Sequence, residues 1–285
     1  MLDIGQTKLV IDFIEEHLPE KLDLFRIARE THVSPFHLHR SFSQILGLTI
    51  HDYLRRRRLT EAARMLMFTD TPIIEIALSA GYESQQAFTR IFKAIYKYPP
   101  NAFRNGQVFY PLQLRFDVGE CDRLLGENGR AAAWKARFAR EDDIPQWMRL
   151  VRLVVDGYPV LDEEEYVRIL RTAIDRNQAL IVKDGGIALG IILFSPSNGR
   201  IDFLGIHPLF RHRGIAKLLL DEVVAAFPRG NHEISITTYR AGDMADTGYR
   251  KTIQSLGFIE AEHLVEFGYP TQKFLLNTAS LQNDN

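Results

Sequence analysis

Two short stretches of this sequence carry groups suited to binding phosphate or nucleic acid. The first is FRHRGIA at residues 210–216, between the apolar run IDFLGI and the run KLLLDEVVAAF, which has helical periodicity. A glycine turn between a strand and a helix exposes backbone N–H groups, and the helix dipole adds to their affinity for an anion. The spacing therefore predicts a phosphate-binding turn, in which Gly214 lets the backbone approach the ligand while Arg211 and Arg213 add positive charge.

The second stretch is SQQAFTRIFKAI at residues 84–95, which repeats SPFHLHRSFSQI at residues 34–45 with an offset of 50. A serine begins each copy as a helix cap, and in the first copy Pro35 follows it at the first helical position. Each copy is expected to bury one apolar stripe and to expose the opposite face. The apolar positions are 38, 42 and 45 in the first copy and 88, 92 and 95 in the second.

The outward faces of these two predicted helices carry groups suited to DNA. Positions 36, 39, 40 and 43 of the first copy read Phe, His, Arg and Ser, and positions 86, 89, 90 and 93 of the second read Gln, Thr, Arg and Lys. Arginine pairs with guanine, and glutamine with adenine, through two hydrogen bonds each. A helical bundle with solvated polar faces is the alternative, and nucleic-acid binding is the interpretation that we favour.

The repeat extends to the segments around these helices. A short apolar helix is expected before each copy, LFRIARET and IIEIALSA, so that each copy completes a helix-turn-helix unit. A long helix begins after Thr49 and joins the two units, and Thr71-Pro72 begins the next helix as a cap followed by proline. From the run Arg55–Arg58 on the long helix we expect one or two contacts with DNA phosphates.

Composition and charge narrow the class of protein. The 285 residues favour two domains, and no apolar run reaches the roughly 18 residues that a membrane span needs, so no membrane partner is expected. Cys121 is the one cysteine, which excludes an intramolecular disulfide framework and fits the cytoplasm. Residues 24–104 hold 12 Lys and Arg against 6 Asp and Glu, a basic block suited to a polyanion. Four histidines of the N-terminal half have no other metal-ligating side chains near them in the sequence, so no metal site is expected: His17, His32, His37 and His51.

The run GYESQQAFTRIFKAIYKYPPNAFR resembles the second helix-turn-helix of AraC/XylS-family transcription regulators, in particular the MarA, SoxS and Rob branch. The resemblance covers about residues 5–105 and implies that two helices of one chain enter successive segments of the major groove of promoter DNA. Most members of the family have Gly where Lys97 stands, and many have Pro where Ile50 stands. The side chains for which the resemblance implies base contacts are Phe36, His39, Arg40, Gln85, Gln86, Thr89 and Arg90.

From Trp134 onward the predicted strands and helices alternate, which indicates an α/β domain. Its segment IDFLGIHPLFRHRGIAKLLL resembles the acetyl-CoA-binding core of GNAT acetyltransferases, marked by V/I-x-P followed by R/Q-x-x-G-x-G/A. The resemblance covers about residues 134–275 and implies acetyl-CoA as cofactor and a mixed, mostly antiparallel sheet. It also implies that the N–H groups of residues 212–216 hold the pyrophosphate and that Ile206 bonds to the pantetheine arm. The cofactor-binding residues expected are Ile206, Arg211, His212, Arg213, Gly214, Ile215 and Ala216.

Catalysis in GNAT enzymes needs a base for the acceptor amine and a proton donor for the thiolate, often a carboxylate and a tyrosine. Asp202 stands at the strand position where many relatives have Glu, and a cleft or edge carboxylate without catalytic work is an equal alternative. Ile253 stands where the usual tyrosine is expected, and Tyr249, one turn earlier on the same helix face, is the substitute candidate, with ordinary packing as its alternative. Tyr239 is a further candidate, and His207 is expected in a turn and not as a base.

The sequence therefore predicts a multidomain protein, with an all-α double helix-turn-helix domain at 1–108, a linker at 109–132 and an α/β GNAT-fold domain at 133–285. The predicted function is sequence-specific regulation of transcription, with acetyl-CoA, a small amine or both bound by the C-terminal domain as effector or substrate. The alternative is an active small-molecule N-acetyltransferase with an attached DNA-binding domain. Double-stranded promoter DNA is the predicted partner, RNA polymerase is a further candidate partner, and the cytoplasm is the expected location.

Overall fold

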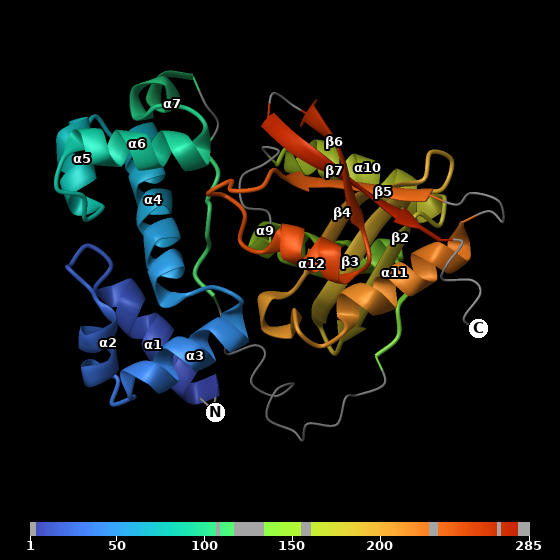
Figure 1. The fold of residues 1–285 in the computed structure, drawn as a ribbon, viewed down its shortest axis with the longest axis horizontal. Helices are drawn as coiled ribbons and strands as arrows, with labels where there is room; N and C mark the ends of the chain where they lie inside the picture. Colours follow the sequence, from blue (N-terminus) through green and yellow to red (C-terminus); the bar gives the residue numbers. More distant parts are fainter. Residues whose placement is uncertain are drawn as a thin grey trace. The chain divides into compact units, whose positions relative to one another are not determined.

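The computed structural model describes residues 4–106, 109–116, 134–154, 161–227, 233–266 and 269–278. These residues form two compact units, a helical unit that extends to residue 116 and a unit of strands and helices that begins at residue 134 (Figure 1). The predicted order, an all-α part followed by an α/β part, is confirmed.

Two helix-turn-helix pairs and a long helix make up the helical unit (Figure 1). The first pair is α2 and α3, the second pair is α5 and α6, and the long helix α4 joins them and packs against members of both pairs. The helices are α1 (Ile4–Glu16), α2 (Leu24–Glu30), α3 (Pro35–Leu46), α4 (Ile50–Phe68), α5 (Ile73–Ser79), α6 (Gln85–Tyr96) and α7 (Pro100–Gly106).

Side-chain caps begin α3, α4 and α6 where the sequence predicts them. The hydroxyls of Ser34 and Ser84 each accept the N–H of the third residue that follows, at 3.3 and 3.2 Å. The Thr49 hydroxyl accepts the corresponding N–H at 3.0 Å. The predicted cap by Thr71 is wrong, because α5 begins at Ile73 without a side-chain cap.

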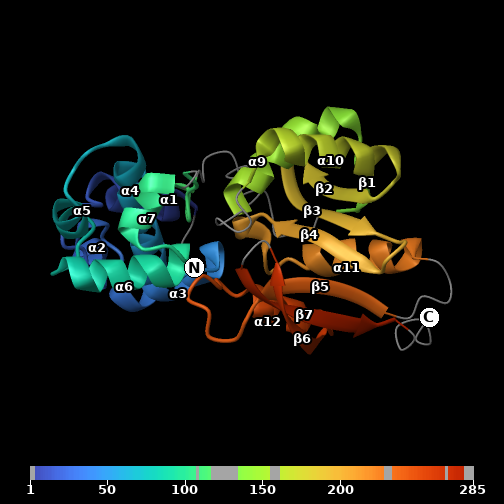
Figure 2. The same ribbon diagram turned by 90° about the horizontal axis from the view of Figure 1, so that it is seen from above.

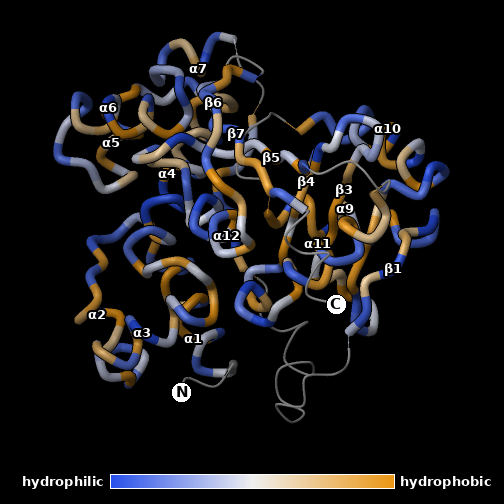
Figure 3. The backbone as a smooth tube through the Cα atoms, turned by 45° about the vertical axis from the view of Figure 1, so that its right-hand side comes forward, coloured by the Kyte–Doolittle hydropathy of each residue, from blue (hydrophilic) through white to orange (hydrophobic). Residues whose placement is uncertain are grey.

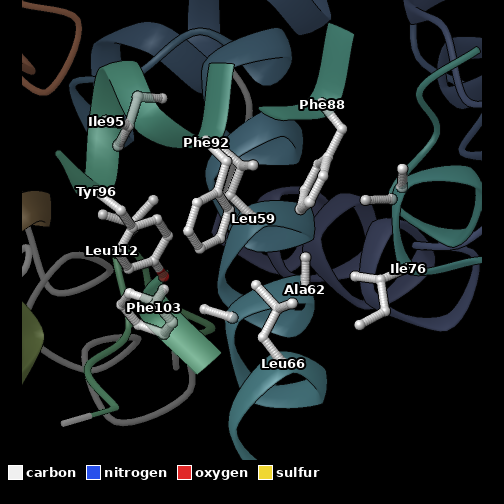
Figure 4. Packing of buried hydrophobic residues seen from close by; sticks show 13 residues of the cluster. Leu59, Ala62, Leu66, Ile76, Phe88, Phe92, Ile95, Tyr96, Phe103 and Leu112 are labelled. Carbon is white, nitrogen blue, oxygen red and sulfur yellow. The ribbon is translucent and has the colours of Figure 1, made fainter. Parts of the chain in front are cut away.

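An aromatic core holds α4, α6 and α7 together (Figure 4). Phe88, Phe92 and Ile95 of α6 are buried, as the apolar spacing of this helix predicts. The ring of Phe92 lies 4.4 Å from that of Tyr96 and 5.3 Å from that of Phe103 in α7, measured between ring centroids. Removing apolar surface from water stabilises the folded state by about 25 cal/mol per Å². Because these aromatic side chains are large and fully buried, their packing holds the second helix-turn-helix pair against the long helix.

The first repeat buries a slightly different stripe from the one predicted. Leu38 and Phe42 of α3 are fully buried, but Ile45 is only partly buried and Leu46 takes its place in the core. Positions i, i+4 and i+8 therefore face inward here, and the apolar stripe of a globular helix is wide enough to hold either spacing.

The helices α3 and α6 end in the same backbone turn with different residues. Gly47 has φ +70° after α3, and Lys97, 50 residues later, has φ +68° after α6. Glycine adopts this left-handed conformation freely, whereas a side chain at Cβ crowds the following carbonyl. The Lys97 ammonium donates to the carbonyl of Ala94 at 2.8 Å.

The second unit is built on a seven-stranded sheet among the described residues. The strand order is β1-β2-β3-β4-β5-β7-β6, which Figure 2 shows from one edge to the other. The strands β4 and β5 run parallel, and the other neighbouring pairs are antiparallel, which confirms the predicted mixed, mostly antiparallel sheet. The elements are β1 (Arg137–Phe138), η2 (Glu141–Asp143), α9 (Ile144–Val154), α10 (Glu163–Asp175), β2 (Ala179–Asp184), β3 (Ile187–Ser195), β4 (Arg200–Ile206), η3 (Pro208–Phe210), α11 (Ile215–Ala226), β5 (Glu233–Tyr239), α12 (Tyr249–Ser255), β6 (Ile259–Glu266) and β7 (Tyr269–Asn277).

Two glycines show that α9 and α11 cover opposite faces of this sheet. A Cβ on Gly190 of β3 would lie 2.4 Å from Ile215 of α11, whereas a Cβ on Gly205 of β4 would lie 3.1 Å from Val154 of α9. Gly190 pairs with Ile206, the neighbour of Gly205, and successive residues of a strand point to opposite faces. The strands β3 and β4 between these helices are mainly hydrophobic (Figure 3).

Substitutions at Gly47 and Lys97 test whether the left-handed backbone after α3 and α6 favours glycine over lysine. Replacing Lys97 by Gly removes the Cβ from a left-handed position, so the free energy of unfolding is expected to rise by up to about 1 kcal/mol. The matched variant Gly47→Lys is expected to lose about 1 kcal/mol for the same reason. Urea unfolding of the full chain measures both changes, and a Lys97→Gly variant less stable than the parent would contradict the expectation.

Candidate functional site

The side chains predicted to contact bases lie on the outward faces of α3 and α6. Both helices bury the opposite side, through Leu38 and Phe42 in α3 and through Phe88 and Phe92 in α6. Thr89 is partly buried beside its exposed neighbours. The predicted residues that are exposed are Phe36, His39, Arg40, Gln85, Gln86 and Arg90.

Phe36 is the most exposed large apolar side chain among the described residues, with 77% of its surface accessible. It stands in the first turn of α3, next to the N-terminal cap. An exposed phenyl ring gains free energy when a partner removes it from water. The methyl group of thymine in the major groove is an apolar surface that would do this.

Each arginine of the run Arg55–Arg58 in α4 bonds to a group of the helical unit. Arg56 and Arg57 are 2% and 8% exposed, so neither guanidinium can reach a ligand at the surface. Arg58 donates to the main-chain carbonyls of two residues that follow α1, Leu18 and Glu20. Arg55 pairs with Asp52 at 2.7 Å. Arg55 and Arg58 are partly exposed, so the one or two phosphate contacts expected from Arg55–Arg58 stay a prediction for these two side chains.

The phosphate turn predicted at residues 211–214 lies at the N-terminus of α11. Gly214 has φ +78°, and a Cβ placed there would meet nothing within 4 Å, which leaves room for a ligand. The first helical hydrogen bond runs from the Leu218 N–H to the Gly214 carbonyl at 3.0 Å. The N–H groups of residues 215–217 precede it and are the ordinary anion-binding donors of a helix start. The Arg213 N–H, in contrast, already bonds to a carbonyl of the turn, at 3.1 Å.

The side chains of this turn divide between the surface and the core. His212 and Arg213 are exposed, and Arg211 is partly buried. Ile215 and Ala216 are buried, so they can contribute only their backbone N–H groups to a ligand. The turn thus combines backbone donors with two guanidinium groups, which is the combination that a pyrophosphate needs.

The strands β4 and β5 separate beside the turn. Their parallel pairing is recorded at Arg200 and Ser235, where the Ser235 N–H donates to the Gly199 carbonyl at 2.7 Å. On its other side β4 pairs with β3 along its whole length up to Ile206. Within the described residues, β4 therefore has a backbone edge near Ile206 that no strand pairs, and an amide-bearing ligand arm can bond to such an edge.

His207 holds the chain between β4 and the phosphate turn. Its N–H donates to the Leu189 carbonyl of β3 at 2.9 Å, and its Nδ1 accepts the N–H of Leu209 at 3.3 Å. Burial, helped by the positive charge of Arg211, lowers the pKa of His207 to about 4. The ring is therefore neutral at pH 7, and His207 caps the short helix η3 that leads to the phosphate turn.

The contacts of Asp202 support the structural alternative. Its carboxylate accepts a hydrogen bond from the Ser195 hydroxyl at 2.6 Å and pairs with Arg200 at 3.2 Å. Asp202 precedes Ile206 by four residues, or about 13 Å along the strand. These contacts join the ends of β3 and β4, and they occupy the carboxylate that a catalytic base would use.

Tyr249 lies close to the phosphate turn although 38 residues separate it from Arg211. The Arg211 guanidinium is 5.7 Å from the centre of the Tyr249 ring, and the Tyr239 ring is 6.1 Å away. The Tyr249 hydroxyl donates to the Val154 carbonyl at 2.8 Å. Ile253 is buried in the core, so α12 presents no phenol at the usual position. A role for Tyr249 as proton donor would require this hydrogen bond to be exchanged.

The described part of the chain shows neither a metal-binding cluster nor a membrane-spanning helix. No group of three His, Cys, Asp or Glu side chains there is placed to hold a metal ion. No helix in the same residues combines the length and the hydrophobicity that crossing a membrane requires. Cys121 lies outside the described residues.

Known proteins resemble each unit of this chain. A profile of the helix-turn-helix domain matches residues 27–106, and a profile of the acetyltransferase (GNAT) family matches residues 147–253. The HTH-type transcriptional regulator YbfP of Bacillus subtilis (strain 168) is 46% identical over 94 residues, which are 33% of this chain and 32% of YbfP. The multiple antibiotic resistance protein MarA of Salmonella typhimurium is 35% identical over 109 residues, which are 37% of this chain and 86% of MarA. The match thus spans about a third of YbfP but most of MarA.

A solved structure resembles the second unit. It is an acetyltransferase of the GNAT family from Bacillus cereus ATCC 10987, with 18% sequence identity and a TM-score of 0.40. The match covers 50% of this chain and 96% of that protein.

The low pKa of His207 makes the stability of the second unit depend on pH. The unfolded chain binds a proton on this side chain below its ordinary pKa of 6.5, whereas the folded chain does not until about pH 4. The contribution of neutral His207 to the free energy of unfolding is therefore fully present above pH 6.5. Up to about 3 kcal/mol of this contribution is lost as the pH falls from 6.5 to 4. His207→Asn keeps an acceptor for the Leu209 N–H but cannot titrate, so its unfolding free energy should fall less over this range. Identical pH profiles for the two proteins would contradict this account.

Proposed function

Because this chain belongs to the AraC-type family of DNA-binding transcription regulators and carries a GNAT-family domain, we propose that its C-terminal unit binds acetyl-CoA and that the bound ligand changes how the N-terminal unit binds promoter DNA. On this proposal the C-terminal unit senses a metabolite, and a small amine is either a second effector or an acceptor. The exposed faces of α3 and α6 supply the base contacts.

The observation that carries the proposal is the position of the glycine turn beside the gap between β4 and β5. A pyrophosphate at the start of α11 would accept hydrogen bonds from the N–H groups of residues 215–217 and face Arg211 and Arg213. An amide-bearing arm that continues from it would reach the unpaired edge of β4 near Ile206. Bound there, acetyl-CoA supplies an acetyl thioester, and the residues around it fit the group.

Binding without rapid turnover fits the side chains near this site better than efficient catalysis does. The candidate base, Asp202, accepts a hydrogen bond from Ser195 and forms an ion pair with Arg200. The candidate donor, Tyr249, donates to a main-chain carbonyl. Proton transfer by positioned side chains contributes about 10²–10⁴-fold to a rate, and neither group is free to supply it without rearrangement. N-acetyltransferase activity is the alternative outcome of the experiments below.

For the N-terminal unit, we propose direct reading of bases in two major-groove segments. Gln86 and Arg90 project from the outward face of α6, and Arg40 projects from that of α3. Each of these side chains can form two hydrogen bonds with one base. A single chain with two such helices docks without forming a dimer, so its target need not be palindromic. RNA polymerase is a further partner on this proposal.

Acetyl-CoA binding is tested by thermal unfolding and calorimetry of the full chain. A ligand that binds only the folded state at 100 times its Kd stabilises the protein by about 2.7 kcal/mol, so millimolar acetyl-CoA is expected to raise Tm. Gly214→Ala places a methyl group at a left-handed position in the turn, and at least about a tenfold loss of affinity is expected if one or two hydrogen bonds to the phosphate are lost. Gly257→Ala is the matched control, because Gly257 also has positive φ but lies outside the turn.

The second arm measures DNA binding with and without acetyl-CoA, on a duplex selected by the full chain from a random-sequence library. A change in Kd in the parent that is lost in Gly214→Ala supports regulation by the ligand. Steady release of free CoA with a panel of amines would instead favour the enzyme. Unchanged Tm and unchanged DNA affinity at millimolar acetyl-CoA would overturn the proposal for the C-terminal unit.

A further inference from the structure

Residues 109–116 run back along α4 from the second helix-turn-helix pair toward the first, and we name them the strap. Figure 1 shows this green segment beside α4. The strap lies beyond residues 27–106, the part that matches the helix-turn-helix domain profile. The predicted linker, 109–132, begins with these residues, and in the structure they belong to the helical unit, with residues 109–113 and 116 buried or partly buried.

The beginning of the strap contacts the second helix-turn-helix pair and its neighbours. The ring of Phe109 lies 5.7 Å from that of Phe68, at the end of α4. The ring of Tyr110 lies 5.1 Å from that of Tyr96 in α6, and the Tyr96 hydroxyl donates to the Tyr110 carbonyl at 3.3 Å. Leu112 is buried in the aromatic core that holds α6 to α4.

The middle of the strap is held by side chains of α4. The Thr60 hydroxyl accepts the N–H groups of Leu112 and Gln113 at 3.1 and 3.2 Å. Arg56 donates to the Leu112 carbonyl at 3.0 Å, and Arg57 donates to the Gln113 carbonyl at 3.2 Å. Four backbone groups of the strap are thus paired in a buried place, where an unpaired polar group would be unfavourable.

The end of the strap contacts the beginning of α4 and α1, and it is linked to α3 of the first helix-turn-helix pair through Tyr53. The ring of Phe116 stacks on that of Tyr53 at 5.4 Å, and Tyr53 lies against Phe42 of α3 at 5.7 Å. Arg115 forms an ion pair with Asp12 of α1.

The buried pair of Arg57 and Glu15 connects this end to the middle. Arg57 donates two hydrogen bonds to the Glu15 carboxylate, each at 2.8 Å. Burial acts to lower the pKa of Arg57, but the bonds to Glu15 outweigh it and hold that pKa above its ordinary value. Tyr53 donates to the same carboxylate at 2.7 Å. Because Arg57 of α4 also donates to the Gln113 carbonyl, α1, α4 and the strap meet at the Arg57 guanidinium.

The length of the strap matches the helix that it follows. Eight extended residues span about 26 Å. The contacts on α4 run from Phe68 back to Tyr53, 15 residues or about 22 Å of helix. An extended segment of this length fastened at both ends limits bending and twisting of the helix between the two pairs.

We propose that the strap fixes the spacing of α3 and α6, and that it thereby determines the spacing of the two DNA segments that the chain recognises. This inference rests on the proposed reading of two major-groove segments. If the strap is released, each helix-turn-helix pair still reads its own segment, but the two binding events no longer reinforce one another fully. Release is therefore expected to weaken binding at the native spacing and to increase tolerance of other spacings.

The test uses Thr60→Val in the full chain, which keeps the size of the side chain and removes the acceptor of two strap N–H groups. Thr69→Val is the matched control. The Thr69 hydroxyl also donates to the carbonyl four residues before it and accepts a backbone N–H, but it does not contact the strap. The probes are the duplex selected from a random library by the parent chain and the same duplex with one or two base pairs inserted between the protected segments.

The parent is expected to bind the lengthened duplexes much more weakly than the original one. Thr60→Val is expected to bind the original about tenfold more weakly, and its preference for the original over the lengthened duplexes should fall at least about fivefold. Thr69→Val should behave as the parent does. A Thr60→Val chain that folds and keeps the parent's spacing preference would overturn the proposal.

Two other outcomes are possible: the Thr60→Val chain does not fold, or the parent chain does not recognise two DNA segments. If Thr60→Val does not fold, as judged by circular dichroism, Phe116→Leu replaces it. This variant removes the ring that stacks on Tyr53 and keeps most of the buried apolar volume at the end of the strap. An unchanged spacing preference in Phe116→Leu overturns the proposal equally. If the parent selects no sequence, or protects a single segment, the proposed reading of DNA fails first. The strap proposal then falls with it.

Discussion

Buried arginines of α4 are the constraint on which the helical unit depends. A guanidinium taken out of water needs acceptors, and removing the partner of a buried charge destabilises a protein by roughly 3–5 kcal/mol. Arg56 and Arg57 find their acceptors on the strap and on Glu15 of α1. The middle turns of α4 can therefore pack only when α1 and the strap are in place, and this requirement makes one body of two helix-turn-helix pairs.

The C-terminal unit places its chemistry at the junction between β4 and α11. Gly190 lets α11 lie against the sheet, and the neutral ring of His207 closes the turn that follows β4. Gly214 then opens the backbone at the helix start. These features shape the helix start at which an anion would bind, whereas the Asp202 carboxylate and the Tyr249 phenol are bonded to other groups. On the proposal that acetyl-CoA binds here, the ligand would act on DNA binding by favouring one of two states and so shifting the balance between them.

Local patterns made much of this structure predictable from the sequence. The repeat at an offset of 50 predicted both helix-turn-helix pairs, because capping by Ser34 and Ser84 and the apolar spacing of α6 depend on residues within one or two turns. The glycine turn at Gly214 was predictable for the same reason. The outward direction of Gln86 and Arg90 followed from the buried stripe on the opposite side of their helix.

The features that the sequence did not predict depend on residues far apart in the chain. Arg56 and Arg57 are buried by residues 112 and 113, which lie 56 positions away, and no spacing within α4 signals this. The Tyr249 hydroxyl is bonded to the carbonyl of Val154, 95 positions away, so its part in catalysis could not be judged from its place on α12. The sequence did indicate that some of these arginines point away from DNA, because four in succession cannot all face one surface of a helix.

The most direct measurement of the central claim is hydroxyl-radical footprinting of the full chain on its selected duplex, with the stoichiometry determined by light scattering. One chain holding α3 and α6 at a fixed spacing is predicted to protect two segments on the same side of the DNA, about 10 base pairs apart, at one chain per duplex. Two protected segments that appear only when two chains are bound, or a single segment per chain, would contradict the account.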